Sequence, residues 1–299
     1  MEEKKQSKFP PELIELYNLH IHGEIDRREF LERAKQFAVG GITATALWEM
    51  LKPNYALGQQ VPESDKRLKT ETVSVPSPQG NGTIKGYLVR PASATGKLPG
   101  ILVVHENRGL NPHIKDIARR LGVANFMALA PDGLTSVGGY PGDDEAGGQL
   151  FGKVDRNKMT EDFVAAANWL KSRPDCTGKI GVTGFCFGGG IANTLAVRMP
   201  DLAAAVPFYG GAPAAADVPK IKAAVLVHHG ALDTRLAEAW PAYEEALKAN
   251  KVPHEGYIYP GAVHGFNNDA TPERYNEAAA KLAWQRTIDW FNKYVRGQS

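Results

Sequence analysis

Residues 179–190 constrain the fold of this chain most, because they combine a strand, a sharp turn and a helix start. The β-branched run 180–183 ends in Gly184, and Cys186 stands two residues later. Three glycines beginning at Gly188 then open an alanine-rich segment with helical character. Small residues let a strand and a helix approach closely without a Cβ clash. We therefore predict that the thiol of Cys186 stands above a sheet, at a helix N-terminus that favours its thiolate form.

The pattern Gly-x-Cys-x-Gly-Gly resembles the nucleophile elbow of α/β-hydrolases, with cysteine in place of serine. In that fold an acid follows a later strand, and a histidine follows the next one. Residues 223–227 predict a buried strand that runs into a loop carrying Asp233, and residues 255–259 predict a strand before His264. The order along the chain therefore predicts a triad of Cys186, Asp233 and His264.

The remaining pattern predicts one α/β domain over residues 66–299, after an N-terminal helical arm and linker over residues 1–65. An antiparallel hairpin is expected within 70–89, and strands then alternate with helices up to a closing amphipathic helix within 274–294. Such alternation is typical of a mostly parallel central sheet with helices on both faces. In the closing helix we expect these apolar side chains to face the core: Leu282, Ile288, Trp290 and Phe291.

The arm supports two interpretations. Arg27 and Arg28, followed by Phe30 and a small-residue stretch, resemble a twin-arginine export signal with a cleavage site near 56–58. The acidic residues around them favour a retained, folded arm instead. We therefore expect a cytoplasmic protein, with periplasmic export as the alternative, and a homodimer formed through the arm.

The composition of the chain limits the classes of binding partner that we expect. The chain has 299 residues, 43% hydrophobic and 23% charged, with a net charge of +2. This balance gives no reason to expect nucleic acid or a membrane as a partner. The strand at 179–183 separates Cys176 from Cys186 too widely for a disulfide, so Cys186 is expected to be free.

Four motifs together resemble the dienelactone hydrolase (carboxymethylenebutenolidase) family. They are the elbow at 184–189, the loop at Asp233, His264-Gly265-Phe266, and the stretch 105–110 after an early strand. The resemblance covers about residues 70–295, and the arm looks like that of a longer bacterial subgroup. It implies a hydrolase that opens a small-molecule lactone or ester through a thioester on the cysteine, without a cofactor.

The resemblance also implies supporting residues. Glu106 matches a glutamate that lies beside the resting thiol, holds it and takes its proton. The oxyanion hole of this fold uses two backbone N–H groups, here those of Phe187 and Asn107. The long glycine-rich loop 132–155 is expected to cap the substrate site.

Two features leave the substrate open. For the family member specific for dienelactone, the resemblance implies an arginine that binds the substrate carboxylate four residues after the histidine. This chain has Asn268 at that position. The candidates for another carboxylate-binding arginine are Arg108, Arg156 and Arg235. The candidates for the acyl pocket, each of which could equally be a core residue, are Tyr140, Phe208 and Tyr209.

His228, His229, Asp233 and His264 together raise the question of a metal site. Neighbouring strand residues face opposite sides of a sheet, so His228 and His229 cannot both join one site, and we expect no metal. Three functions remain: a dienelactone hydrolase-like enzyme, a broad carboxylesterase or thioesterase, and a non-catalytic binding protein on a hydrolase fold.

Overall fold

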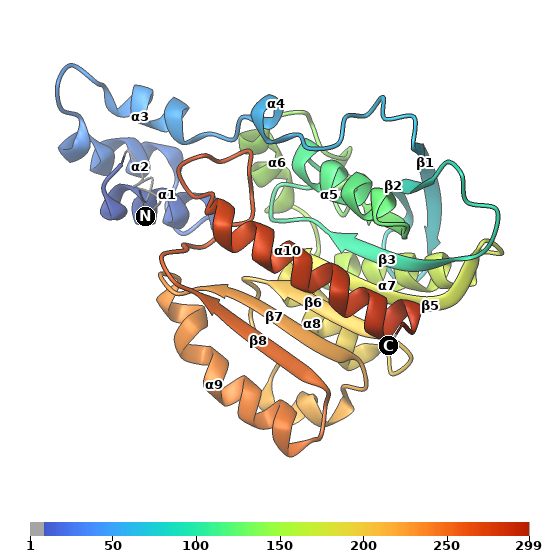
Figure 1. The fold of residues 1–299 in the computed structure, drawn as a ribbon. Helices are drawn as coiled ribbons and strands as arrows, with labels where there is room; N and C mark the ends of the chain where they lie inside the picture. The colour runs from blue at the N-terminus through green and yellow to red at the C-terminus, as the bar shows by residue number, and fades with distance from the viewer. Residues whose placement is uncertain (1–8, 299) are drawn as a thin grey trace.

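The computed structural model describes residues 9–298, which form one eight-stranded sheet preceded by N-terminal helices (Figure 1). The strand order is β1-β2-β4-β3-β5-β6-β7-β8. β1 and β2 pair antiparallel with each other, and β2 pairs antiparallel with β4, whereas all later neighbours are parallel. The strands are β1 (Leu68–Ser77), β2 (Gly82–Pro91), β3 (Leu98–Val104), β4 (Met127–Pro131), β5 (Cys176–Phe185), β6 (Ala204–Phe208), β7 (Ala224–Gly230) and β8 (His254–Tyr259).

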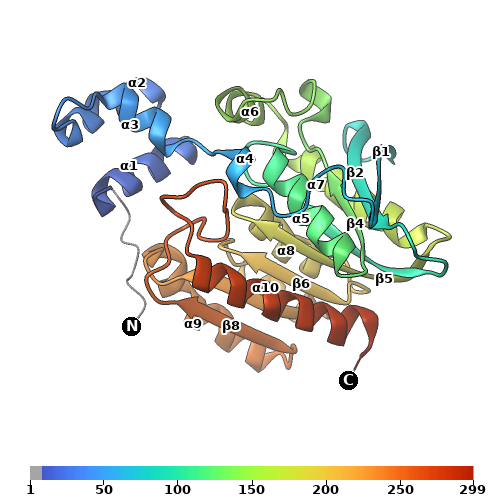
Figure 2. The same cartoon turned by 45° about the horizontal axis from the view of Figure 1, so that its top comes forward.

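Helices cover both faces of this sheet, as the alternating pattern predicts (Figure 2). The helices of the arm and linker are α1 (Pro11–Ile21), α2 (Arg27–Ala34), α3 (Ala44–Leu51) and α4 (Tyr55–Gly58). The later α-helices are α5 (Pro112–Val123), α6 (Asp144–Phe151), α7 (Arg156–Ser172), α8 (Phe187–Arg198), α9 (Thr234–Ala249) and α10 (Glu277–Phe291). The single turns are η1 (Lys35–Phe37), η2 (Thr135–Val137), η3 (Ala215–Lys220) and a π-helical η4 (Asn292–Arg296).

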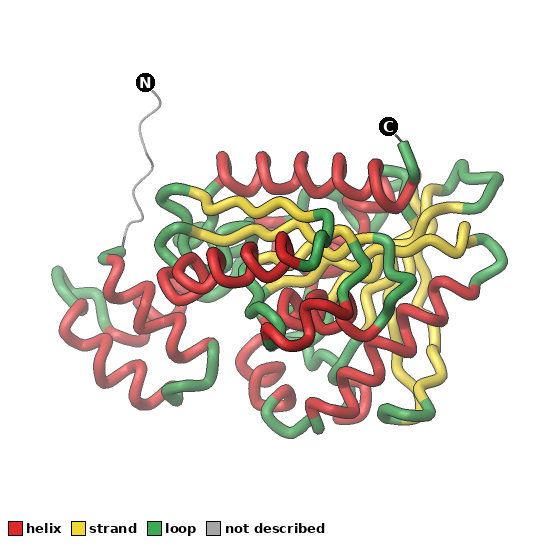
Figure 3. Tube along the Cα trace, turned by 90° about the horizontal axis from the view of Figure 1, so that it is seen from below, coloured by secondary structure: helices red, strands yellow, loops and turns green. Residues whose placement is uncertain are grey.

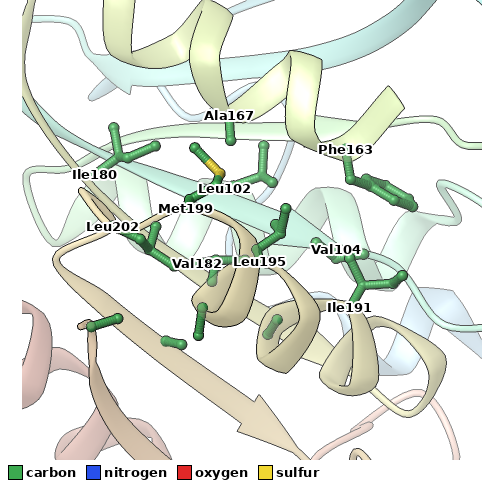
Figure 4. Close-up of a cluster of buried hydrophobic side chains, with 14 of the residues drawn as sticks. Leu102, Val104, Phe163, Ala167, Ile180, Val182, Ile191, Leu195, Met199 and Leu202 are labelled. Atoms are coloured by element: carbon green, nitrogen blue, oxygen red, sulfur yellow. The ribbon is translucent and has the colours of Figure 1, made fainter. Parts of the chain in front are cut away.

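Each face of the sheet has its own apolar layer, because successive strand residues point to opposite sides. Leu102 and Val104 of β3 belong to one apolar cluster with residues of α7, α8 and α9, and Figure 4 shows them in the same region as Phe163 and Leu195. Ile101 and Val103 pack on the other face, against α5 and α10. The predicted α/β-hydrolase fold, with a mostly parallel sheet between helices, is confirmed.

The arm has a third, separate apolar cluster. Phe30 is fully buried there, between Tyr17 of α1 and Trp48 of α3. Asp26 caps α2 by accepting a hydrogen bond from the Glu29 N–H, which stabilises a helix start at Arg27. Figure 3 shows these N-terminal helices grouped beside the sheet layers, and the arginine pair lies within a folded helix.

Two local details differ from the expectation. The loop 132–155 contains η2 and α6, because Asp143 caps α6 by accepting from the Ala146 N–H. Leu282 is exposed, since α10 turns Ala283, Thr287 and Trp290 toward the sheet instead. Residues 9–298 contain no helix that is long and apolar enough to cross a membrane.

Candidate active site

Cys186 lies between β5 and α8 on a strained turn. Its backbone has φ 54° and ψ −113°, a conformation that non-glycine residues rarely adopt. A Cβ at Gly184 would lie 2.0 Å from the Gly188 carbonyl oxygen, and a Cβ at Gly188 would lie 2.3 Å from the Val104 carbonyl oxygen. These two glycines therefore permit the close approach of strand and helix that lifts the thiol above the sheet.

Asp233 and His264 lie next to each other at the carboxyl ends of β7 and β8. The Nδ1 atom of His264 is 2.5 Å from Oδ2 of Asp233, so Nδ1–H donates to the carboxylate and Nε2 is left facing the thiol side. The ligand atoms of Cys186 and His264 lie within 4.8 Å of each other. The structure thus brings the three predicted triad residues together.

An arm residue, His22, completes this cluster. Its Nε2 atom lies 3.5 Å from Sγ of Cys186 and 3.2 Å from Nε2 of His264. The two imidazole rings meet edge to face, with centroids 4.7 Å apart. The hydrogen-bond partner of the thiol is therefore a histidine that precedes the catalytic domain in the sequence.

The opposite charges of the cysteine and the histidine in this cluster each favour the ionised form of the other. Burial opposes ionisation of the thiol, but His264 and His22 outweigh it and lower the pKa of Cys186 to about 6. Burial likewise opposes the imidazolium, but the cysteine and Asp233 raise the pKa of His264 to about 9. Burial raises the pKa of Asp233, yet its hydrogen bond to His264 leaves it below the ordinary value. Both shifts favour a thiolate paired with an imidazolium.

Glu106 lines the same cavity as Cys186, on the loop after β3. Its Oε2 atom accepts a hydrogen bond of 3.4 Å from Nδ2 of Asn268. The neighbouring His105 anchors this loop, since its Nδ1 lies 2.5 Å from the Glu106 carbonyl oxygen and its Nε2 accepts from the Gly133 N–H. Asn268, four residues after His264 in the sequence, therefore contacts the carboxylate of Glu106.

The two predicted oxyanion donors come from different segments, since Phe187 directly follows Cys186 and Asn107 lines the same cavity as Cys186. Phe187 is the first residue of α8, so its N–H has no partner within the helix. Asn107 is on the Glu106 loop, and its side-chain amide donates to the Ile21 carbonyl oxygen of the arm. The arm thus holds the loop that carries the second predicted donor.

The cavity above the cluster has a volume of about 190 Å³ and lies between the arm and the catalytic domain. From the arm and linker it is lined by Tyr17, His20, Ile21, Trp48, Lys52, Pro53 and Tyr55. From the rest of the chain it is lined by Glu106, Asn107, Arg108, Tyr140, Gly142, Asp143, Asp144, Glu145, Cys186, His264, Asn268 and Arg274. The segment 140–145 thus borders the cavity.

The predicted substrate-binding residues fall into two groups. Tyr140, Arg108 and Asn268 line the cavity, with Arg108 donating to the Ile21 carbonyl oxygen at 2.9 Å. Phe208 is fully buried in the apolar layer, and Tyr209 is buried with its ring 5.0 Å from that of His264. Neither Phe208 nor Tyr209 lines this cavity, so their predicted place in an acyl pocket is not seen here and both are buried beside the site.

Neither of the other candidate arginines lines this cavity. Arg235 is exposed on α9. Arg156 stacks on the Phe151 ring, 3.8 Å from its centroid. Among the candidates for a carboxylate-binding arginine, only Arg108 borders the cavity.

Sequence reasoning missed His22, Tyr17 and Arg274. Arg274 lines the cavity, with its guanidinium 5.7 Å from the centroid of the Tyr17 ring, and it lies against Gly265. The sequence signal for Arg274 was its place ten residues after His264. His22 carried no comparable signal, because it follows the end of an arm helix.

His228 and His229 do not join this cluster. His228 is buried between Tyr259 and Thr287, at 3.0 Å and 3.2 Å. His229 faces the other side of β7, toward Trp240. The opposite orientations predicted for these neighbours are confirmed by their separate partners.

Comparisons with known proteins identify the family of this chain. Residues 84–295 match the model of the Dienelactone hydrolase family, and residues 1–40 match a YqhI-like region. A Salmonella typhimurium protein named "Putative carboxymethylenebutenolidase" is 34% identical over 245 residues, which cover 77% of this chain and 89% of that protein. "Putative hydrolase fragment YghX" of Escherichia coli is 56% identical over 114 residues, 38% of this chain and 97% of the fragment.

Solved structures give the same assignment. A "Putative Dienelactone Hydrolase" from Klebsiella pneumoniae has a TM-score of 0.67 and 32% identity, and the match covers 76% of this chain and 99% of that one. A dienelactone hydrolase-like promiscuous phosphotriesterase from metagenomic libraries has a TM-score of 0.66 and 28% identity, over 76% of this chain and 99% of that one. The chain therefore belongs to the dienelactone hydrolase family and carries a YqhI-like N-terminal region.

Proposed function

We propose that the protein is a cysteine hydrolase that opens a lactone or carboxylic ester through a thioester on Cys186. The observation that carries this proposal is the strained turn at Cys186 above the His264–Asp233 pair. A thiolate is the attacking form of cysteine, and the lowered pKa of about 6 favours that form near neutral pH.

In the first half-reaction, the thiolate attacks the carbonyl carbon of the ester or lactone. The N–H groups of Phe187 and Asn107 bind the oxyanion, and its collapse breaks the carbon–oxygen bond. The imidazolium of His264 donates its proton to the leaving alkoxide, which becomes an alcohol. In a lactone this alcohol stays attached to the acyl group on Cys186.

In the second half-reaction, neutral His264 takes a proton from water as the water attacks the thioester carbon. The carbon–sulfur bond breaks, and the thiolate and the imidazolium are restored together with the free acid. Asp233 accepts from Nδ1–H of His264 throughout and holds the Nε2 atom toward the reacting centre. Glu106 is proposed to hold and activate the thiol while substrate enters.

Two versions of this function differ in the charge of the preferred substrate: a broad esterase without preference for an anion, and an enzyme for an anionic lactone such as dienelactone. Asn268 is neutral, which favours a broad carboxylesterase or thioesterase without dienelactone preference. Arg108 and Arg274 line the cavity and favour an anionic substrate. Glu106 and Asp144 line it as well, so the net effect on a substrate carboxylate must be measured.

The experiment compares three substrates with purified protein: a dienelactone, a neutral lactone and a short p-nitrophenyl ester. We expect hydrolysis that is lost in Cys186→Ala and kept in the control Cys176→Ala, because Cys176 lies at the far end of β5. Strong preference for the dienelactone would indicate that Arg108 or Arg274 binds the substrate carboxylate. Hydrolysis of only the neutral substrates would favour the broad esterase, and no hydrolysis of any would favour a binding role.

Assembly through the arm, in a homodimer, stays a prediction. The arm exposes Val39 and Met50, with 70% and 49% of their surface accessible. A second subunit on this surface would bury such side chains. Sedimentation over a concentration series would detect the dimer, and a monomer at all concentrations would contradict it.

A further inference from the structure

One side chain that contacts Cys186 and His264 has no role in the proposed reaction, namely the His22 imidazole. Among the described residues, His22, Cys186 and His264 form the one set of three ligand-type side chains whose ligand atoms converge, all within 4.8 Å of one another. Two of these atoms carry the proposed chemistry. The third comes from the arm, so the cluster joins two parts of the fold.

Two of the three separations between these atoms match those of a tetrahedral zinc site, and the third, between Cys186 and His264, is within 4.8 Å. Bond lengths of roughly 2.3 Å for Zn–S and 2.0–2.1 Å for Zn–N place sulfur and nitrogen about 3.5 Å apart and two nitrogens about 3.3 Å apart. The corresponding distances here are 3.5 Å from Sγ of Cys186 to Nε2 of His22 and 3.2 Å between the two Nε2 atoms. We propose that Cys186, His22 and His264 bind one zinc ion whose fourth coordination position faces the cavity.

Hydrogen bonds alone satisfy this arrangement poorly. With His264 as the imidazolium, its Nε2 carries a proton and cannot accept a hydrogen bond, so when His22 donates to the thiolate the two Nε2 atoms lie 3.2 Å apart without a hydrogen bond between them. A zinc ion would bind a lone pair from each of the three atoms at once. Thiolate and imidazole are ligands that zinc prefers in proteins.

The surroundings already orient two of the ligands. The contact of 2.5 Å between Nδ1 of His264 and Asp233 is the arrangement in which a carboxylate fixes the tautomer of a zinc-bound histidine. Asn107 and Arg108 both donate to the Ile21 carbonyl oxygen, and this holds the backbone next to His22. The ligand set is therefore positioned by contacts that do not depend on an ion.

Bound zinc would stop hydrolysis, because it occupies the nucleophile and the acid–base nitrogen at the same time. This regulatory part of the inference rests on the proposed function, whereas zinc binding itself does not. Since one ligand belongs to the arm, the ion would also tie the arm to the catalytic domain. Removal of zinc by a chelator would release the thiol.

The test titrates zinc sulfate into the full-length protein in competition with a chromophoric chelator. We expect one ion per chain with a dissociation constant below 1 µM. Cobalt(II) added to the zinc-free protein should give a thiolate-to-cobalt charge-transfer band and the intense visible bands of a tetrahedral site. No binding at micromolar zinc, or cobalt spectra without a thiolate band, would overturn the proposal.

Variants identify the ligands. His22→Ala should weaken zinc binding at least 100-fold, while His254→Gln, which changes a histidine at the start of β8 and outside this cavity, should not change it. Unaltered binding in His22→Ala would contradict the proposal. Circular dichroism checks the fold of each variant, and the cobalt spectrum of the unmodified protein tests the site even if a variant fails to fold.

Measurements of hydrolysis with and without zinc separate the proposed hydrolase function from the proposed inhibition by zinc. Hydrolysis measured with chelator present tests the proposed function alone, and addition of stoichiometric zinc should then reduce it at least tenfold. Zinc that binds without reducing hydrolysis would overturn the regulatory role. Absence of hydrolysis in the chelated protein would count against the proposed function and leave zinc binding to be judged by the titration.

Discussion

The arm and the catalytic domain are both folded around apolar clusters, but they differ in how they contribute to the site. The catalytic domain has an apolar layer on each face of its sheet, whereas the arm has a small core around Phe30 and Trp48. Around the cavity the two parts meet through polar contacts, among them the pair of Arg27 and Glu145 at 3.3 Å. The comparison indicates that the sheet positions the candidate triad of Cys186, Asp233 and His264, while the arm lines part of the cavity beside it.

The largest expected effect tests whether the reaction belongs to the catalytic domain. Cys186→Ala should lower turnover at least about 1,000-fold, because nothing else can form the thioester. Cys186→Ser should keep only a trace, since an alcohol does not ionise near neutral pH as this thiol does. Steady-state kinetics of both variants, with Cys176→Ala as control, make the measurement. Turnover in Cys186→Ala like that of the unmodified protein would contradict the assignment.

A matched pair of core substitutions tests the independence of the two cores. Phe126→Ala in the catalytic domain should lower the global free energy of unfolding by about 3–5 kcal/mol, because this fully buried ring packs on Phe291. Phe30→Ala, equally buried, should mainly lower the hydrogen-exchange protection of arm amides. Exchange measured by mass spectrometry resolves both regions. Equal loss of protection in the sheet for Phe30→Ala would show that arm and sheet unfold as one unit.

The pH dependence of stability should reflect the catalytic domain. Burial is the main cause that lowers the pKa of His229 to about 4, and the charges of Asp233, His264 and Arg235 act on it as well. In the unfolded chain this histidine takes up a proton near pH 6.5. The contribution of His229 to the free energy of unfolding is therefore complete above that pH and is lost as pH falls toward 4.

For this one residue the loss is about 2 kcal/mol between pH 7.5 and pH 5. Urea unfolding of the unmodified protein and of His229→Gln at both pH values measures it as a difference. The variant should show the smaller loss, and identical losses in the two proteins would contradict the pKa assignment.

The smallest effect concerns the contact between the two regions. Arg27→Ala removes the ion pair with Glu145, whose side chains are 43% and 27% exposed. Exposed pairs of this kind contribute about 1 kcal/mol or less, so we expect a KM change of less than about fivefold and an unaltered kcat. Arg33→Ala, which removes an ion pair within the arm, is the control. A large fall in kcat for Arg27→Ala alone would mean that arm position controls the chemistry.

The sequence predicted the catalytic domain better than the arm. Strand and helix alternation, with the order Cys186, Asp233 and His264, was sufficient for the fold, and it predicted the residues that lie together at the sheet edge. The glycines at 184 and 188 are explained by steric exclusion, because a Cβ at either position would clash with neighbouring backbone atoms. Local patterns of this kind are visible in a single sequence because neighbouring residues cause them.

Contacts between distant segments could not be predicted in the same way. His22 is 242 positions from His264, and no local pattern relates the two residues. The helix at 144–151 had a signal that was overlooked, since Asp143 is a good N-cap and Asp144 and Glu145 favour a first turn. Leu282 shows the limit of helical periodicity, because small residues such as Ala283 can face a sheet as well as large ones do.

The most direct test of the central claim is to trap the acyl-enzyme. The protein is mixed with a short p-nitrophenyl ester in chelator and quenched in acid within milliseconds, and His264→Gln is treated in parallel to slow release of the acid. Intact mass spectrometry should show one added acyl group, mapped by proteolysis to Cys186 and removed by neutral hydroxylamine, as a thioester is. Rapid turnover with no adduct, or with the acyl group on another residue, would contradict the account.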